Sequence, residues 1–195
     1  MLLSEFDFPF DPVLVADHPV IPRDRARLLV LDRQGGERVH RQVADLPSLL
    51  KPGDLVVVNN TKVMPARVPA QVRSNGKLLD LLFVEDLGQG IWEVLIKGRF
   101  RPGAVIEFPG GGTGEIVERS RLRTTVQVSG VASVYELMQA TGTMPLPPYI
   151  KREPSADDQE WYQTMFAQHE GAIAAPTAGL HFTRELVQAL ARKGI

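Results

Sequence analysis

A run of small residues leads into a histidine near the end of the sequence. Residues 171–179 are Gly-Ala-Ile-Ala-Ala-Pro-Thr-Ala-Gly, and His181 follows two positions later. Small residues let the backbone approach a ligand closely, and free amides at the start of a helix attract anions. Thr177 adds a hydroxyl, the amides around Gly179 add donors, and His181 adds an imidazole that titrates near neutral pH. The pattern predicts a binding site here; the alternative is close packing of backbone, with His181 as a partly buried, hydrogen-bonded side chain.

A second candidate follows the apolar run Leu55–Val58, which predicts a buried strand. Asn59, Asn60 and Thr61 come directly after it, and polar residues at the end of a buried strand are a common place for ligand contacts in α/β folds. The alternative is a turn in which these side chains bond to nearby backbone, which suits the sequence Asn-Asn-Thr equally well.

Cationic and aromatic residues suggest contacts to nucleic acid. Arg23 and Arg25 lie in a locally basic early segment, and Arg99 and Arg101 form a later cluster. Such side chains can contact phosphates, although a solvated surface with salt bridges explains them as well. Tyr149 lies in the proline-rich segment 145–150, which should run extended and could present the ring for stacking on a base. The alternative for this segment is a rigid connector.

Composition excludes several classes of protein. The 195 residues contain no cysteine, which excludes disulfides, a thiolate zinc site and a thiol nucleophile. The four histidines are widely spaced, so we predict no metal site, and neither common nucleotide-binding glycine motif is present. The formal net charge of −1 means that any nucleic acid must meet a local patch. No apolar run approaches the roughly 20 residues of a membrane span, and the start does not resemble a secretory signal, so we expect a soluble, cytoplasmic protein that does not contact membranes.

The elements expected around these residues change in character along the chain. Apolar runs near 28–31 and 39–43, separated by Gly35-Gly36, predict a hairpin, and 45–50 predicts one helical turn. The middle is strand-like, with short apolar runs separated by glycine-rich turns, which favours a small barrel or sandwich. The predicted strands are 66–72, 78–84, 91–96, 104–108, 113–118 and 124–128.

The last third of the chain predicts helices. Ser133 and Glu136 form a capping-box pattern, and Gly142 can end that helix. A second helix is expected from Asp157, with Trp161 and Met165 stacked one turn apart, and likewise the pair Tyr162 and Phe166. A third should be capped by Thr183, with one apolar face made of Leu186, Val187 and Leu190.

Taken together, three motifs resemble one family closely. They are Asn59-Asn60-Thr61-Lys62-Val63, Pro145-Leu146-Pro147-Pro148-Tyr149-Ile150 and Ala174-Ala175-Pro176-Thr177-Ala178-Gly179-Leu180-His181-Phe182. The segments 22–31, 52–63, 65–67 and 162–164 add to the likeness. The chain resembles the S-adenosylmethionine:tRNA ribosyltransferase-isomerases of queuosine biosynthesis over nearly its whole length. Later signatures of that family do not occur, so the chain resembles its amino-terminal half.

The resemblance implies a fold and a reaction. The fold is an incomplete α/β large domain with an inserted small antiparallel β-barrel, which we divide as 1–62, 63–130 and 131–195. The ribosyl part of S-adenosylmethionine moves to the aminomethyl group of a 7-deazaguanine base at the wobble position of tRNA, is isomerised to an epoxycyclopentanediol, and adenine and methionine leave. S-adenosylmethionine serves as the ribosyl donor, no other cofactor or metal is implied, and we expect a monomer at full length.

The reaction suggests roles for particular residues. A weak base can start the isomerisation beside the sulfonium, the departing adenine needs a proton, and the attacking amine must be neutral; His181 suits any of these steps. Phosphates of the RNA are assigned to Arg23, Arg25, Arg99 and Arg101. Substrate binding is assigned to Asn59, Asn60, Thr61, Arg67, Tyr149, Tyr162, Gln163, Thr177, Gly179 and Phe182.

Two other interpretations stay open. One is a non-catalytic half that keeps only ligand or RNA binding, and the other is a generic barrel that binds RNA, which the near-neutral charge disfavours. We also expect the chain by itself to expose apolar surface at Leu55–Val58 and on the final helix, where neighbours from the rest of the family's fold are absent.

Overall fold

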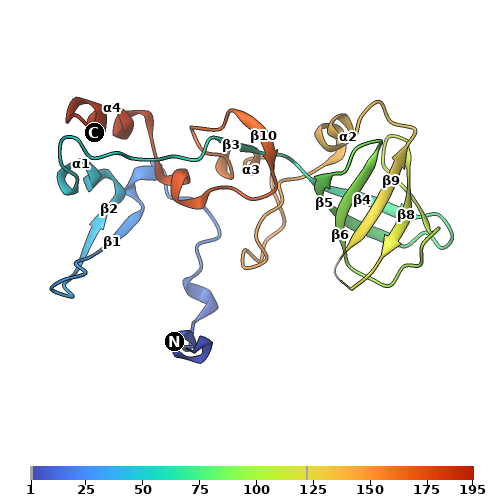
Figure 1. Cartoon of the computed structure of the whole chain (residues 1–195), viewed down its shortest axis with the longest axis horizontal. Helices are drawn as coiled ribbons and strands as arrows, with labels where there is room; N and C mark the ends of the chain where they lie inside the picture. Colours follow the sequence, from blue (N-terminus) through green and yellow to red (C-terminus); the bar gives the residue numbers. More distant parts are fainter. Residues whose placement is uncertain (1, 122) are drawn as a thin grey trace.

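The computed structural model describes residues 2–121 and 123–195 (Figure 1). A β-barrel forms one end of the molecule, and a thinner assembly of short strands and helices forms the other. Short 3-10 turns occupy Leu3–Phe6, Pro12–Leu14, Arg23–Arg25, Val43–Asp45 and Thr177–His181. No helix in these described ranges is long and apolar enough to cross a membrane.

The barrel is closed by six antiparallel strands in the order β4-β5-β6-β9-β8-β7. Its strands are β4 (Arg67–Val72), β5 (Leu78–Asp86), β6 (Ile91–Ile96), β7 (Val105–Glu107), β8 (Thr113–Arg119) and β9 (Thr124–Ser129). Alternate side chains point inward, as the two-residue period of a strand requires. Phe83 fills the interior, with Trp92 at 5.6 Å and Phe108 at 6.1 Å between ring centroids. The predicted barrel is confirmed, and each predicted strand falls within a few residues of an observed one.

The barrel is an insertion between two strands that pair with each other. β3 (Thr61–Val63) precedes it, and β10 (His169–Ala172) returns after it to lie parallel to β3. The side chain of Gln163 reinforces this junction, because its Oε1 accepts from Val63 N at 2.9 Å and its Nε2 donates to Val63 O at 3.0 Å. The predicted fold class, α/β elements with an inserted antiparallel barrel, is therefore confirmed. The division at residues 62 and 130 stays a prediction.

Helix α2 (Val134–Thr141) packs on β4 and follows the predicted capping pattern. Ser133 Oγ accepts from Glu136 N at 3.0 Å, and Gly142 ends the helix. Gly142 is required by close approach rather than by a left-handed conformation. A Cβ there would lie 1.9 Å from Pro65 O and 2.5 Å from Met138 O.

The other end of the molecule carries the predicted hairpin, β1 (Arg27–Leu31) with β2 (Arg38–Gln42), and the predicted helical turn, α1 (Leu46–Leu49). Helix α4 (Arg184–Arg192) begins at Thr183, whose Oγ1 accepts from Leu186 N at 3.2 Å. Leu186 and Leu190 are buried against Val43 in a small cluster. The expectation that the final helix exposes its apolar face is therefore wrong, because the segment around α1 covers it.

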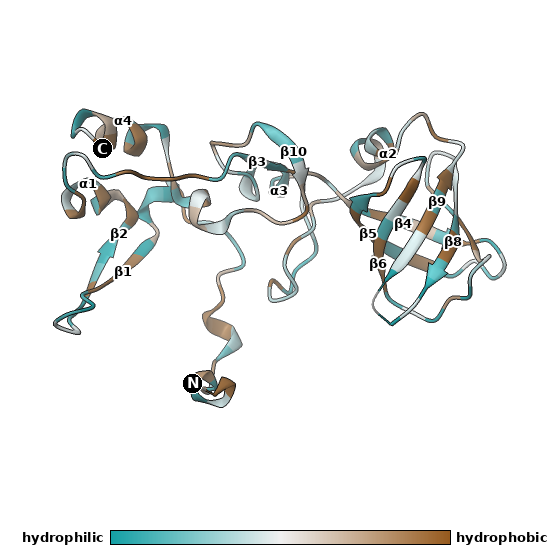
Figure 2. Ribbon diagram, viewed as in Figure 1, coloured by the Kyte–Doolittle hydropathy of each residue, from teal (hydrophilic) through white to brown (hydrophobic). Residues whose placement is uncertain are grey.

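Two predicted elements differ from the structure. Leu55–Val58 is extended and exposed, and it joins no strand ladder among the described residues (Figure 2). A strand needs a partner for its backbone, and this chain places none beside the run; its exposure matches our expectation for the chain by itself. The predicted helix from Asp157 shrinks to α3 (Asp158–Trp161), which ends at Tyr162, so its one-turn pairs Trp161/Met165 and Tyr162/Phe166 do not form in a helix.

Candidate functional site

A cavity of about 480 Å³ brings together residues from widely separated parts of the chain. Its walls come from the early segment 16–27, the extended segment 146–152, helix α3 and the 3-10 turn Thr177–His181. Six residues predicted for the site line it: Arg23, Arg25, Tyr149, Tyr162, Thr177 and His181. The three-dimensional structure therefore places parts of two sequence motifs and the early arginines around one space.

His181 closes the 3-10 turn and contributes its imidazole to the cavity wall. Burial, and then the positive charge of Arg23, hold the pKa of His181 below its usual value. The imidazole is therefore neutral at neutral pH. A neutral imidazole can accept a proton or donate a hydrogen bond, which are the two capabilities that a proton-transferring group needs.

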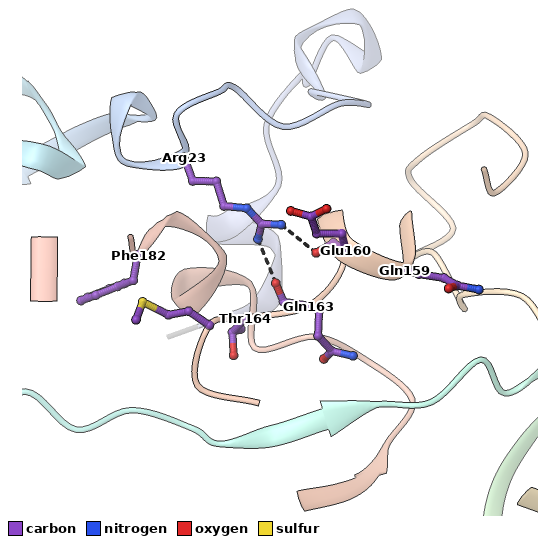
Figure 3. Close-up of a pocket in the computed structure, with 7 residues that line it drawn as sticks. Arg23, Gln159, Glu160, Gln163, Thr164 and Phe182 are labelled. Carbon is purple, nitrogen blue, oxygen red and sulfur yellow. Dashed lines mark hydrogen bonds between the residues drawn. The ribbon is translucent and has the colours of Figure 1, made fainter. Parts of the chain in front are cut away.

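Arg23 holds two walls of the site together (Figure 3). One guanidinium nitrogen, Nη1, donates to Gln163 O at 2.8 Å and to Leu180 O at 3.3 Å, and Nη2 donates to Glu160 O at 2.7 Å. These carbonyls belong to the α3 region and to the turn before His181. Arg23 thus fixes the spacing of the site and supplies positive charge, a use that differs from the predicted contact with RNA phosphate.

A buried ion pair that the sequence did not reveal supports the opposite wall. Arg152 and Asp158 form two parallel hydrogen bonds, Nη1 to Oδ2 at 2.7 Å and Nη2 to Oδ1 at 2.6 Å, and the Asp158 side chain is 2% exposed. The Arg152 hydrogen bond, opposed by burial, lowers the pKa of Asp158, so its carboxylate stays ionised. The Ser155 amide donates to Asp158 Oδ2 at 2.7 Å, which draws the 152–158 loop around the carboxylate. The partners lie six positions apart in the sequence, and no regular element makes that spacing recognisable.

Aromatic rings line the cavity beside this ion pair. Trp161 packs edge-on against His18, with 5.7 Å between ring centroids, and Arg152 lies 6.0 Å over the same ring. Tyr149 is 53% exposed, whereas Tyr162 is buried, and burial raises the pKa of the Tyr162 phenol. Tyr149 therefore has the freedom to stack on a ligand, and Tyr162 forms part of the fixed wall. His18, Trp161 and Arg152 were missed because each lies outside the motifs themselves, and only the fold brings the three side chains together.

The residues of the Asn-Asn-Thr motif lie elsewhere. Asn59 Oδ1 accepts from Thr61 N at 2.8 Å, and Asn60 O accepts from Gln168 N at 2.8 Å. Thr61 belongs to β3, and none of the three lines the cavity. The turn that we kept as the alternative describes this motif better than a ligand contact.

Two further predicted residues are used structurally. Both polar side-chain atoms of Gln163 are hydrogen-bonded to the Val63 backbone, as described for the barrel junction. The Gly179 amide donates to Pro176 O at 2.8 Å, so it is not available to an anion. A Cβ at Gly179 would lie 3.1 Å from Thr164 Cγ2, which favours the alternative of close packing.

The remaining predicted residues lie outside the cavity. Phe182 lines a neighbouring hollow of about 540 Å³ with Arg23 and packs edge-on against Phe166. Arg67 starts β4 and lines a separate cleft beside the barrel. Arg99 and Arg101 lie in the loop between β6 and β7, and neither belongs to the wall of the main cavity.

The donor set of the site suits an organic ligand. Across residues 2–121 and 123–195, no three His, Asp or Glu side chains gather in a way that could hold a metal ion. Guanidinium groups and rings dominate the cavity, and these groups bind carboxylates, phosphates and heteroaromatic rings.

The fold and the cavity define a class: an α/β protein with an inserted closed barrel, whose candidate site is a cavity between the early segment and the region after the barrel. Residues 3–195 match the family model described as queuosine biosynthesis protein, and the chain belongs to that family.

Curated relatives share this region at high identity. The chain is 42% identical to the S-adenosylmethionine:tRNA ribosyltransferase-isomerase of Citrifermentans bemidjiense and 40% identical to that of Geotalea uraniireducens, and each match covers all of this chain. The chain spans 58% of the length of these relatives. A crystal structure of S-adenosylmethionine tRNA ribosyltransferase from Thermotoga maritima matches 98% of this chain and 55% of its own, at 28% identity and a TM-score of 0.39.

Proposed function

We propose that this chain acts in queuosine biosynthesis as the amino-terminal part of an S-adenosylmethionine:tRNA ribosyltransferase-isomerase. The enzyme would transfer the ribosyl group of S-adenosylmethionine to the 7-aminomethyl-7-deazaguanine at the tRNA wobble position and isomerise it. The products would be epoxyqueuosine-tRNA, adenine and methionine. A cytoplasmic location and a monomeric full-length protein remain predictions.

The observation that carries this proposal is the meeting of Tyr149, Thr177 and His181 at one cavity, together with membership of the family. Tyr149 comes from one family-like motif and the other two from another, and Tyr149 and Thr177 lie 28 positions apart in the sequence. Their meeting is what a shared ligand requires. Arg25 and Arg27 add positive charge at the same space, which suits a carboxylate or a phosphate.

Three residues of the cavity wall supply the binding and the proton transfer that the reaction needs. Tyr149 has an exposed ring for stacking on adenine or the deazaguanine, and Thr177 offers a hydroxyl to a polar group of either substrate. His181 is neutral, so it can take the proton that the carbon beside the sulfonium or the attacking ammonium must lose. The same imidazole, once protonated, can return a proton to the departing adenine.

Release of adenine tests the proposal directly. The chain, alone and joined to the carboxyl-terminal remainder of the Citrifermentans bemidjiense relative, is incubated with S-adenosylmethionine and tRNA that carries the 7-aminomethyl-7-deazaguanine. We expect adenine release that requires both substrates from the joined protein. If the joined protein releases none while the intact relative does, the proposal is wrong.

The second candidate function, a half that binds without turnover, is decided in the same experiment. The exposed run Leu55–Val58 favours it for the chain by itself, because a fold that lacks neighbours there is incomplete. Retained binding of S-adenosylmethionine or tRNA by the chain alone, without adenine release, would establish it.

A further inference from the structure

A positively charged cleft lies between the barrel and the proline-rich segment, apart from the cavity just described. Its volume is about 960 Å³. Strands β5 and β6 form one side, and Pro145, Pro147 and Pro148 form part of the other. Its cations come from four places in the sequence: Arg67, Lys77, Lys97, Arg119, Arg121 and Arg123.

The charge of this cleft contrasts with that of the chain. Six cations line it against two acidic residues, Asp80 and Glu93, whereas the whole chain has a formal net charge of −1. Arg67 pairs with Asp80 at 3.2 Å and Arg123 with Glu93 at 3.3 Å, so the six lining cations outnumber the two lining carboxylates by four. Such a concentration of like charge destabilises a surface unless an anion shares it.

Arg67 adds a second, independent sign of a ligand. Its Nε is buried and finds no hydrogen-bond partner among the described residues. A buried, unmatched N–H group is unfavourable, and a bound acceptor oxygen would remove that penalty. Arg67 is itself a lining residue of the cleft, so its guanidinium lies beside the space that an anionic ligand would occupy.

The lining of the cleft also includes exposed apolar side chains. Leu78 is 78% exposed and Leu95 is 58% exposed, and both lie among the cations. A surface that combines guanidinium and ammonium groups with exposed apolar side chains fits a polyanion that carries flat, weakly polar rings, which is a description of RNA.

The cleft also adjoins the candidate site. Leu146 and Tyr162 line both spaces, so a strand lying in the cleft can send one nucleotide into the cavity. Enzymes that modify a base commonly hold the flanking backbone and draw the target base into a separate pocket.

We propose that this cleft binds the RNA backbone next to the nucleotide that enters the cavity. The inference rests on the proposed function, since that function supplies tRNA as the substrate. It moves the phosphate contacts predicted for Arg99 and Arg101 to the cations of the cleft. Lys97 and Arg121 are exposed members of this set.

The test measures binding of an unmodified anticodon stem-loop RNA to the whole chain by fluorescence anisotropy over a range of salt concentrations. The variant is Lys97→Glu with Arg121→Glu. The matched control is Arg33→Glu with Arg38→Glu, which makes the same change in net charge on the exposed hairpin at the other end of the molecule. Circular dichroism checks that both variants fold.

We expect the cleft variant to lose roughly tenfold or more in affinity, and the slope of log K against log salt to become shallower by about one to two units. The control should change affinity by at most about twofold. Equal losses in both variants, no loss in the cleft variant, or no binding of the RNA by the parent chain would overturn the proposal.

The RNA probe lacks the reactive base, so binding is measured separately from chemistry. Cleft-dependent binding without adenine release from the joined protein would leave this inference standing and remove the proposed function. If the joined protein releases adenine and the cleft substitutions leave that release unchanged at limiting tRNA, the proposed function stands and the inference about the cleft is wrong.

Discussion

His181 owes its chemistry to its surroundings in the fold rather than to its own position in the sequence. Desolvation beside the cavity wall and the Arg23 guanidinium both disfavour the imidazolium form. Arg23 in turn is held by the carbonyls of Glu160 and Gln163, so the charge that acts on His181 is fixed in place. A base prepared in this way is ready at neutral pH without a carboxylate partner.

We predict that His181→Ala, in a protein of the relatives' full length that contains this chain, lowers turnover by roughly two orders of magnitude or more. The free energy of unfolding should change little, because a side chain on the cavity wall makes few core contacts. Steady-state adenine release and thermal unfolding measure the two effects. His169→Ala, on exposed β10, is the control and should keep full turnover.

The pH profile separates a proton-transferring His181 from a structural one. Because its pKa lies below the usual 6.5, turnover that needs the neutral ring should persist as pH falls through 6.5 and fail only at lower pH. The sign for stability is the same: the unfolded chain takes up the proton first, so this contribution is complete above pH 6.5 and is lost below it. A large loss of melting temperature in His181→Ala, with turnover per folded molecule preserved, would assign the residue to packing.

For single residues, the sequence predicted several side chains that line the cavity, but it did not predict which residues they bond to. Thr177 and His181 were recognisable because small residues and a helix start surround them. The Arg152–Asp158 pair was not, because it depends on how the 152–158 loop closes on itself. Gln163 was predicted as a ligand contact and instead bonds to Val63, one hundred positions earlier in the chain, a pairing that only the folded structure reveals.

Among the elements, helix α2 and strand β4 are joined by a backbone hydrogen bond where the chain leaves the helix. Thr143 N donates to Arg67 O at 2.8 Å, directly after Gly142, and the missing side chain of Gly142 lets this contact form. The segment that runs on from there, through Pro148, forms a side of the cationic cleft. The geometry of the cleft thus depends on one glycine.

We predict that Gly142→Ala lowers the free energy of unfolding by about 2 kcal/mol. The new Cβ would meet two backbone carbonyls, and such overlap outweighs the modest gain from a less flexible unfolded chain. Thermal unfolding should show a midpoint lower by roughly 4–8 °C for a domain of this size. Gly35→Ala, in an exposed turn where the nearest atom belongs to the Asp32 side chain rather than to the backbone, is the control and should lose no more than about 1 kcal/mol. An unchanged midpoint for Gly142→Ala would show that the close approach is absent in solution.

The barrel was predictable because each strand carries its own signal: alternating inward apolar residues, with glycine-rich turns between strands. Helix α2 and helix α4 were predictable from their capping residues. The helix from Asp157 was not, because Asp158 serves the ion pair with Arg152 and the chain leaves the helical conformation at Tyr162. Leu55–Val58 shows the complementary case, in which a strand signal is present and the partner strand is not.

On the scale of the whole molecule, the barrel end is self-sufficient and the other end is not. The barrel closes its own sheet and encloses a continuous core. The opposite end has two small clusters, and Leu55 and Val57 lie 86% and 84% exposed on an extended segment (Figure 2). Contiguous exposed apolar residues of this kind mark a surface that other polypeptide covers.

We therefore predict that the chain binds a hydrophobic dye, and that Leu55→Ser with Val57→Ser lowers the dye fluorescence while the melting temperature stays within about 2 °C. Side chains that are already in water contribute little to the stability of this chain, so their loss changes the free energy of unfolding by no more than about 0.5 kcal/mol. Leu186→Ser makes the same kind of change at a buried position of α4. It should lower the free energy of unfolding by about 3 kcal/mol, and the midpoint by roughly 6–12 °C, because it removes a core side chain and leaves a polar group in its place. If the Leu55 and Val57 substitutions destabilise the chain as much as Leu186→Ser does, the run is buried in solution, and another part of this polypeptide or a second copy already covers it.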